Sequence, residues 1–134
     1  SAIDLETRTI SAFDCISTFT IEEFKLEATP SPKMDLSSGY IFGCDICQDV
    51  CPWNKKLERG QRALVSLEKN FTWNKKQHDL IEFLLEKKPQ EVKENIEALS
   101  NSLFKKFFFN TAFFRSGKKG LLKNLNYYLK HMLK

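Results

Sequence analysis

The feature that most constrains this chain is a short run of cysteines that ends in a proline. Cys44, Cys47 and Cys51 are followed by Pro52, which gives the spacing C-x2-C-x3-C-P. This spacing closes the bacterial ferredoxin run C-x2-C-x2-C-x3-C-P, whose last cysteine ligates the other cluster in two-cluster ferredoxins. Proline lacks an amide hydrogen and has a fixed φ, so it redirects the chain directly after that ligand. The run predicts two thiolates for one iron–sulfur cluster and one thiolate for another.

A cluster held by the C-x2-C pair needs a third thiolate, but the position where the ferredoxin run has one is Ile41. The remaining cysteine of the chain is Cys15. Residues 28–40 are rich in proline, serine and glycine, which predicts a loop between Cys15 and the pair. Closing such a loop costs on the order of a few kcal/mol, which iron–thiolate bonding exceeds. We therefore expect Cys15, Cys44 and Cys47 to hold one cluster.

Other uses of the cysteines remain open. A C-x2-C pair also occurs in structural zinc sites, although those usually carry a second closely spaced Cys or His pair, which this chain lacks. Disulfides or buried thiols are further alternatives.

The chain begins without the basic and apolar regions of a signal peptide and has no run of about 18 apolar residues for a membrane span. We therefore expect a cytoplasmic protein, in which disulfides are rare. A single rearranged cluster on all four cysteines is the last alternative.

Beyond the cysteines the apolar pattern becomes helical. Residues 79–85 form a broad apolar helical face, and Pro89 suits the first turn of a following helix. Gly117 and Gly120 are expected to introduce a last helix over residues 121–132. The helix that follows Pro89 is expected to have an apolar stripe of Val92, Ile96, Leu99, Leu103, Phe104, Phe107 and Phe108.

The expected fold class is mainly α. We expect a ferredoxin-like iron–sulfur segment over residues 1–60, incomplete at its amino-terminal side, and a small α-helical, HEAT-like array over residues 61–134. The helix near the first cysteine has two interpretations. Thr20 and Glu23 form a capping-box pattern, whereas Asp14 would cap a helix that begins earlier. The residues do not decide between them.

Three strings of the sequence resemble those of the epoxyqueuosine reductase family. Residues 15–22 read C-I-S-T-F-T-I-E, where the family has C-I-S-Y-L-T-I-E, and residues 43–54 read G-C-D-I-C-Q-D-V-C-P-W-N. Residues 111–124 are similar to the family segment T-P-L-x-R-x-G-x-x-G-L-x-R-N. The resemblance runs from about residue 1 to the end of the chain, and the cysteine strings are its most specific part.

The resemblance implies an oxidoreductase that reduces epoxyqueuosine to queuosine at the wobble position of tRNA. The family uses a cobalamin and two [4Fe-4S] clusters that deliver electrons to it. The implied cluster ligands are Cys15, Cys44 and Cys47 for the cluster nearer the cobalamin, and Cys51 for the other. Cobalamin contacts are implied for Ser17 and Asp45, for which a helix-start hydroxyl and a solvated loop acid are alternative interpretations.

Three parts of the family have no counterpart in this chain: a first C-x2-C-x2-C-x3-C-P element, the cobalamin-binding domain and the acidic catalytic residue. We therefore assign no catalytic residue and expect no activity from this chain alone. The missing amino-terminal domain would be supplied in cis or in trans, unless the chain is an inactive remnant. The rival functions are a stand-alone ferredoxin-type electron-transfer module and a zinc-stabilised nucleic-acid-binding module.

Charge is distributed unevenly along the chain. Residues 1–67 carry seven Lys/Arg and ten Asp/Glu, whereas residues 68–134 carry fourteen and seven. A surface rich in cations attracts polyanions, so we expect the second half to contact the anticodon region of tRNA. A basic surface without a partner is the alternative, and the interleaved phenylalanines are more typical of a core than of base stacking. The expected contact residues are Lys105, Lys106, Arg115, Lys118, Lys119 and Lys123.

Overall fold

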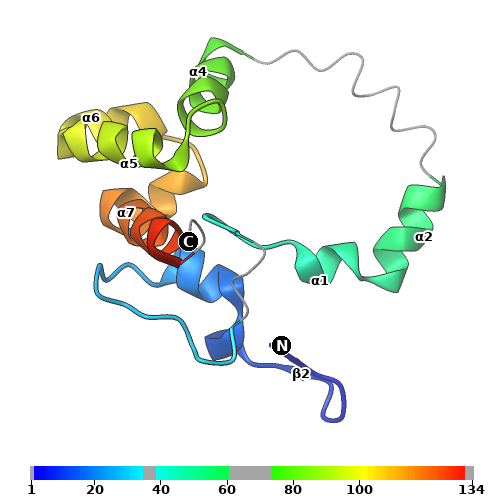
Figure 1. Cartoon of the computed structure of the whole chain (residues 1–134). Helices are drawn as coiled ribbons and strands as arrows, with labels where there is room; N and C mark the ends of the chain where they lie inside the picture. The colour runs from blue at the N-terminus through cyan, green and yellow to red at the C-terminus, as the bar shows by residue number, and fades with distance from the viewer. Residues whose placement is uncertain (1, 35–38, 61–73, 132–134) are drawn as a thin grey trace. The chain divides into compact units, whose positions relative to one another are not determined.

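The computed structural model describes residues 2–34, 39–60 and 74–131, which are mainly helical (Figure 1). The chain forms two compact units: Ser1–Gly43 with Lys88–Lys134 is the first, and Cys44–Lys87 is the second. The two domains expected on either side of residue 60 do not coincide with these units. The first unit is instead held together by contacts between segments far apart in the sequence.

The first unit begins with a small hairpin. Strands β1 (Ile3–Asp4) and β2 (Thr9–Ile10) pair antiparallel, with Ile3 opposite Ile10. The Asp4 carboxylate accepts hydrogen bonds from the backbone N–H groups of Glu6 and Thr7, at 2.9 and 3.1 Å, and so stabilises the turn. These bonds, the one from Thr7 foremost, lower the pKa of Asp4. The hairpin leads into η1 (Ala12–Asp14), a single 3₁₀ turn.

A short helix follows the first cysteine. Residues 16 and 17 are helical and continue into η2 (Thr18–Glu22), which has π-helical geometry; the two together are called helix 16–22 below. The interpretation of Thr20 as a helix cap is wrong, because Thr20 lies inside the helix and its hydroxyl donates to the Ile16 carbonyl at 2.9 Å. The helix begins close to Asp14, whose carboxylate accepts a hydrogen bond from Ser31.

The loop expected over residues 28–40 is confirmed for its described part, because residues 28–34, 39 and 40 contain neither helix nor strand. Residues 35–38 lie outside the described residues.

Two short helices return the chain to the first unit. Helix α5 (Pro89–Ala98) has Pro89 at its amino end, as expected, and buries Val92 and Ile96. The continuous stripe expected beyond them is wrong, because the helix ends before Leu99 and Leu103 is 54% exposed. The break is explained by Ser100, whose side chain accepts from Leu103 N–H at 3.2 Å and caps the next helix, α6 (Asn101–Phe108).

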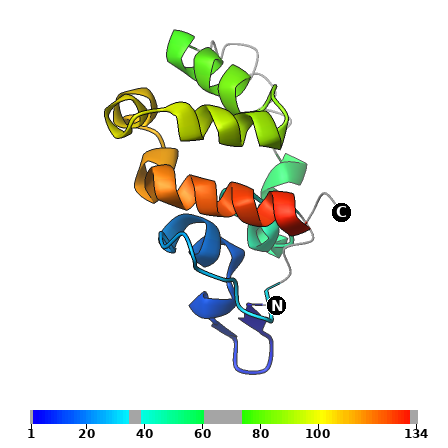
Figure 2. The same cartoon turned by 60° about the vertical axis from the view of Figure 1, so that its left-hand side comes forward.

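The last helix lies at the centre of the first unit. Helix α7 (Phe113–His131) contacts α5 and α6 on one side and helix 16–22 on the other (Figure 2). It begins earlier than expected and is interrupted at Gly117, where φ is 64° and ψ is 178°. Residue 132, expected at its end, lies outside the described residues. The buried apolar core comprises Ile16, Phe19, Val92, Ile96, Phe104, Phe108, Leu121 and Leu125.

The second unit contains α1 (Ile46–Asp49), α2 (Pro52–Gly60) and α4 (Lys75–Leu84). The helical pattern of residues 79–85 is confirmed by α4, which starts earlier than the apolar pattern. Its start is fixed by a capping box that the sequence interpretation missed: Asn74 accepts from Gln77 N–H at 3.0 Å, and the Gln77 side chain accepts from Asn74 N–H at 2.8 Å.

None of the helices in the described ranges combines the length and the apolar character that crossing a membrane requires.

Candidate iron–sulfur site

Cys15 lies at the junction between η1 and helix 16–22 in the first unit. Its backbone is extended, with φ −82° and ψ 127°, and its side chain is half-buried. Its carbonyl oxygen accepts from the N–H groups of Thr18 and Phe19, at 3.0 and 3.4 Å. These bonds form the first turn of helix 16–22, so the orientation of this helix determines where Cys15 is held. Ser17, the expected cobalamin contact, is half-buried in the same turn.

Cys44 and Cys47 lie at the start of the second unit. Cys44 follows Gly43, whose φ of 73° is in the left-handed region that favours glycine. Cys47 is exposed within α1. Asp45 begins this helix, because its carbonyl oxygen accepts from the backbone N–H groups of Gln48, at 2.8 Å, and Asp49, at 2.9 Å. The C-x2-C pair is therefore carried on one tight helical turn.

Cys51 begins the second helix of this unit. Its carbonyl oxygen accepts from Lys55 N–H at 3.1 Å, and Pro52 is the first residue of α2. Asn54 joins the two helices, since its Nδ2 donates to the Gln48 backbone oxygen at 3.0 Å and to the Gln48 side-chain oxygen at 2.9 Å. The sequence interpretation missed Asn54, although it ends the string over residues 43–54. A new helix thus begins directly after Cys51, and Asn54 links it to α1.

The four cysteines, all within the described residues, form no disulfide. Cys15 belongs to the first unit, and Cys44, Cys47 and Cys51 belong to the second. In the described part of each unit, no three His, Cys, Asp or Glu side chains are gathered as a metal site. Thiols that are half-buried or exposed, with no competing disulfide, fit an iron–sulfur cluster by the chemistry of their donors. The division of these ligands among clusters stays a prediction.

The basic residues of the second half differ in what they contact. Lys105, Lys106 and Lys119 are exposed. Arg115 pairs with Glu22, its Nη2 lying 2.6 Å from the carboxylate. Lys118 donates to two backbone carbonyls at the end of α5, those of Glu97 at 3.0 Å and Leu99 at 2.6 Å. Among the six expected contact residues, Lys105, Lys106 and Lys119 therefore combine exposure with the absence of an ion pair within the described residues.

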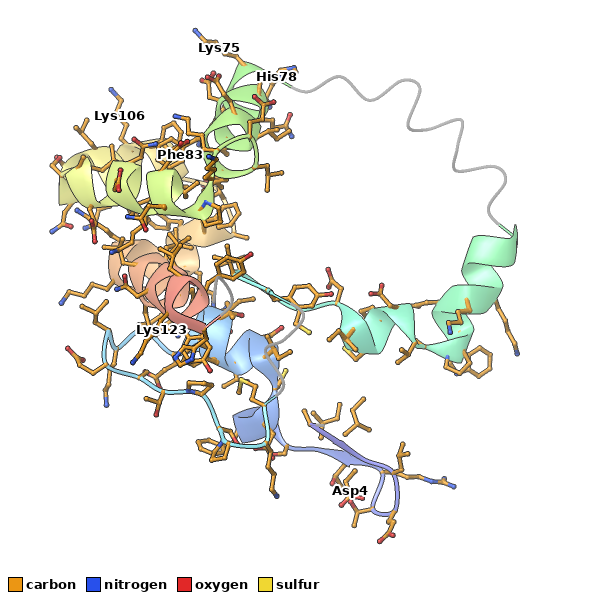
Figure 3. All side chains as sticks on the ribbon, in the orientation of Figure 1. Asp4, Lys75, His78, Phe83, Lys106 and Lys123 are labelled. Atoms are coloured by element: carbon orange, nitrogen blue, oxygen red, sulfur yellow. The ribbon has the colours of Figure 1, made fainter. Side chains whose placement is uncertain are left out.

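Lys123 requires a correction. The sequence interpretation placed it on a phosphate-facing corner, but its residue is 2% exposed and lies against helix 16–22 (Figure 3). Its Nζ donates to the carbonyl oxygens of Phe19 and of Glu23, the latter at 2.8 Å. Burial lowers the pKa of Lys123 to about 8, and the nearby Glu23 carboxylate partly opposes this. The Lys123 ammonium is therefore a buried hydrogen-bond donor inside the first unit and is not available on the surface.

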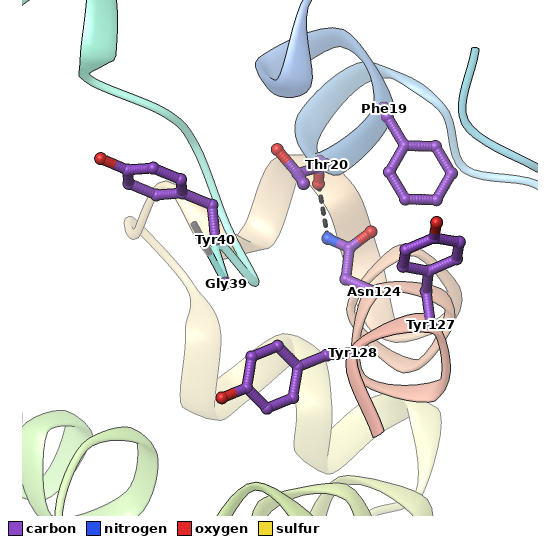
Figure 4. Close-up of a pocket in the computed structure, with 7 residues that line it drawn as sticks. All are labelled: Phe19, Thr20, Gly39, Tyr40, Asn124, Tyr127 and Tyr128. Carbon is purple, nitrogen blue, oxygen red and sulfur yellow. Dashed lines mark hydrogen bonds between the residues drawn. The ribbon is translucent and has the colours of Figure 1, made fainter. Parts of the chain in front are cut away.

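Asn124 lies beside Lys123 and is 3% exposed. Its Nδ2 donates to the Thr20 carbonyl at 2.7 Å, whereas its Oδ1 has no hydrogen-bond partner among the described residues (Figure 4). The adjoining cavity has a volume of about 10 Å³, which is about enough for one water molecule. Its lining residues are Phe19, Thr20, Gly39, Tyr40, Asn124, Tyr127 and Tyr128.

Comparison with known proteins agrees with the chemistry of the cysteines. Residues 1–54 match the 4Fe-4S double cluster binding domain. This range contains Cys15 and the whole C-x2-C-x3-C-P run. The chain therefore carries a 4Fe-4S double cluster domain, followed by helices that the match does not cover.

Curated relatives of the chain are epoxyqueuosine reductases, with which it shares homology over part of their length. That of Cellulophaga algicola is 32% identical over 113 residues, covering 84% of this chain and 31% of the relative. That of Synechocystis sp. is 42% identical over 53 residues, covering 40% of this chain and 18% of the relative. That of Cyclobacterium marinum is 47% identical over 51 residues, covering 38% of this chain and 16% of the relative. The chain thus spans less than a third of the length of each of these relatives. No solved structure matches it.

Proposed function

We propose that this chain is the carboxyl-terminal part of a cytoplasmic, cobalamin-dependent epoxyqueuosine reductase. It contributes ligands to two [4Fe-4S] clusters, while the cobalamin and the catalytic acid are held by an amino-terminal domain supplied in cis or in trans. Helices α5, α6 and α7 then belong to a HEAT-like array that faces tRNA. The observation that carries the proposal is the homology with the Cellulophaga algicola reductase, which extends over 84% of this chain and is not confined to the cysteines.

The cysteines have distinct roles in this proposal. Cys15, Cys44 and Cys47 ligate the cluster nearer the cobalamin, and Cys51 ligates the more distant one. The clusters supply one-electron transfer when bound, and the protein supplies the thiolates and their surroundings. Ser17 and Asp45, each two or fewer residues from a ligand in the sequence, contact the cobalamin.

The cluster assignment is tested by anaerobic reconstitution of the chain with ferrous iron and sulfide. We expect bound iron and acid-labile sulfide in near-equal amounts, with the broad visible absorption of iron–thiolate charge transfer. Replacing Cys15, Cys44 or Cys47 by Ser should abolish this absorption. Replacing Cys51 by Ser should preserve most of it, because the three-thiolate cluster stays intact.

Zinc is measured in the same samples as the control for the rival site. Bound zinc without sulfide would favour a zinc-stabilised module and contradict the proposal. Full cluster content in Cys15→Ser would also contradict it, because the third thiolate would then come from elsewhere.

The tRNA contact rests on the exposed cations of the first unit. Lys105 and Lys106 are neighbours on the exposed side of α6, and their helix contains no acidic residue. Phosphate contacts release counterions, so the logarithm of the binding constant should fall steeply with the logarithm of salt concentration. This contact also separates the proposal from a stand-alone ferredoxin module, which has no reason to bind tRNA.

Filter binding of tRNA across a salt series tests this contact. The double variant Lys105→Ala/Lys106→Ala should bind more weakly and reduce the magnitude of the salt slope by about 2. The matched control is Lys25→Ala/Lys33→Ala, which removes two exposed cations from the amino-terminal part of the same unit. Equal binding by the two double variants would contradict a tRNA-facing α6.

A further inference from the structure

Within the first unit, helix 16–22 contacts the residue that precedes Cys44 through one hydroxyl group. Cys15 directly precedes this helix, and its carbonyl oxygen belongs to the first turn. Farther along, the Thr20 hydroxyl accepts from the N–H of Gly43 at 3.2 Å. Gly43 is the residue immediately before Cys44. The chain that enters the C-x2-C pair is therefore tied to the helix that begins at Cys15.

The Thr20 hydroxyl is buried and both donates and accepts a hydrogen bond. It donates to the Ile16 carbonyl at 2.9 Å while it accepts from Gly43, and the residue is 2% exposed. Valine has nearly the same shape but can make neither bond. Removing a partner from a buried donor or acceptor costs more than the net value of the bond, because the remaining group stays desolvated.

Helix α7 holds the opposite end of helix 16–22. The last carbonyl groups of a helix have no partner within it, and here they accept from side chains of α7. Lys123 donates to the carbonyls of Phe19 and Glu23, and Asn124 donates to that of Thr20 at 2.7 Å. Ser116 donates to the Ile21 carbonyl at 3.3 Å. Helix 16–22 is thereby fixed in orientation.

These contacts lie in the interior. Lys123, Asn124 and Ser116 are 2%, 3% and 4% exposed. A buried ammonium is costly unless its hydrogen bonds are made, so Lys123 holds its two carbonyls in a defined arrangement. The Phe19 ring, with its centroid 3.7 Å from Nζ, completes the surroundings of the charge.

We propose that Thr20 and Lys123 are positioning residues for the iron–sulfur ligands. Lys123 fixes the carboxyl end of helix 16–22, and this helix in turn fixes Cys15 at its start and, through Thr20, the chain that enters Cys44. The proposal rests on the proposed function, because positioning matters to a cluster only where these cysteines ligate one. It gives the basic helix α7 a role that is separate from any contact with tRNA.

The first experiment measures the apo-protein. In a background where Cys44, Cys47 and Cys51 are Ser, Cys15 is the single thiol, and its rate of reaction with a disulfide reagent reports how often its surroundings open. Thr20→Val and Lys123→Met should each raise this rate by about tenfold. Thr20→Ser, which keeps the hydroxyl, should restore the wild-type rate. Thr18→Val is the matched control, since it makes the same change two residues earlier in the same helix, and it should leave the rate unchanged.

The second experiment measures iron release from the reconstituted chain to a chelator. Thr20→Val should release iron about tenfold faster than Thr18→Val, and Thr20→Ser should behave as wild type. Circular dichroism verifies that each variant is folded. Ser116→Ala, which removes the hydroxyl that donates to the Thr20 and Ile21 carbonyls at the same helix end, is used with the same readouts if Thr20→Val does not fold.

The outcomes separate the inference from the function on which it rests. Wild-type chain that takes up no iron and sulfide would overturn the proposed function, while the thiol rates in the apo-protein still test the positioning. Reconstituted wild-type chain with equal thiol and release rates for Thr20→Val and Thr18→Val would overturn the inference and leave the proposed function standing.

Discussion

The ammonium of Lys123 lies 3.7 Å from the centroid of the Phe19 ring and donates a hydrogen bond to the carbonyl oxygen of the same residue. Phe19 thus contacts this cation with both its ring and its backbone. The two residues are separated by about 100 positions in the sequence, and together they join α7 to helix 16–22. A cation that composition alone would place on the surface is therefore part of the interior.

The first prediction concerns pH. Burial lowers the pKa of Lys123 to about 8 from its ordinary value of 10.5. Between these pH values the unfolded chain binds a proton that the folded chain has released, so the free energy of unfolding rises with pH in this window. Below about pH 8 both states are protonated, and the cost of burying the charge is fully present. Urea unfolding across the window should show this rise.

The contribution of Lys123 is isolated by comparing variants, because the pH dependence of wild type alone sums over every titratable group of the chain. Wild type should gain stability relative to Lys123→Met as the pH rises, with a slope of at most about 1.4 kcal/mol per pH unit. Lys119→Met changes an exposed lysine four residues earlier and should retain the wild-type slope. Parallel curves for wild type and Lys123→Met would contradict the buried ammonium.

The second prediction concerns the core. Phe108 is 0% exposed, and its ring lies 4.5 Å from that of Phe104, 5.0 Å from Phe107 and 6.0 Å from Phe113, centroid to centroid. Phe108→Ala should lower the free energy of unfolding by about 3–5 kcal/mol. The neighbouring Phe109 is 56% exposed, so Phe109→Ala should cost much less. Similar losses for both variants in urea titrations would show that α6 is turned differently.

The third prediction concerns the interruption of α7. Gly117 has φ 64° and ψ 178°, a conformation that is essentially restricted to glycine. A Cβ at this position would meet nothing within 4 Å, so the effect of Gly117→Ala is that of backbone strain alone. We expect a loss of about 1–3 kcal/mol in the free energy of unfolding. Asn126→Ala, an exposed site in the same helix, should change it by less than about 0.5 kcal/mol. If Gly117→Ala lost no more stability than Asn126→Ala, the result would argue against the kink at Gly117.

The fourth prediction concerns the ion pair between Arg115 and Glu22. Both Nε and Nη2 of the guanidinium donate to one carboxylate oxygen, at 3.2 and 2.6 Å, but the side chains are 64% and 46% exposed. Exposed pairs are weak and screened by salt. A double-mutant cycle with Arg115→Ala and Glu22→Ala should give a coupling of about 0.2–1 kcal/mol that decreases as salt is added. A salt-independent coupling above about 2 kcal/mol would mean that the pair, rather than the buried bonds of Lys123, holds helix 16–22.

Features that depend on neighbouring residues, such as the start of a helix at a proline, were predictable from the sequence. Pro89 marks the amino end of α5 because the first residues of a helix donate no intrahelical hydrogen bond, so proline, which lacks an N–H, is tolerated there. Pro52 begins α2 for the same reason. The cysteine spacing predicted a 4Fe-4S domain, which the comparison over residues 1–54 confirms. The HEAT-like arrangement of the later helices stays a prediction.

Long-range contacts explain what the sequence could not show. The burial of Lys123 depends on carbonyl groups of helix 16–22, which a count of charges does not include. Thr20 fits a capping pattern locally, but its hydroxyl bonds to Ile16 within the helix and to Gly43 across the loop. The apolar period after Pro89 continues through Ser100, whose cap nevertheless starts a new helix. In each case a polar group is engaged by a partner that periodicity does not reveal.

The most direct test of the central claim is X-ray absorption at the iron and zinc edges of the anaerobically reconstituted chain. Ligation of a cubane by Cys15, Cys44 and Cys47 predicts sulfur neighbours around iron together with the iron–iron scattering of a [4Fe-4S] cluster, and the loss of both in Cys15→Ser. Zinc surrounded by four sulfurs, without iron–iron scattering, would contradict the account.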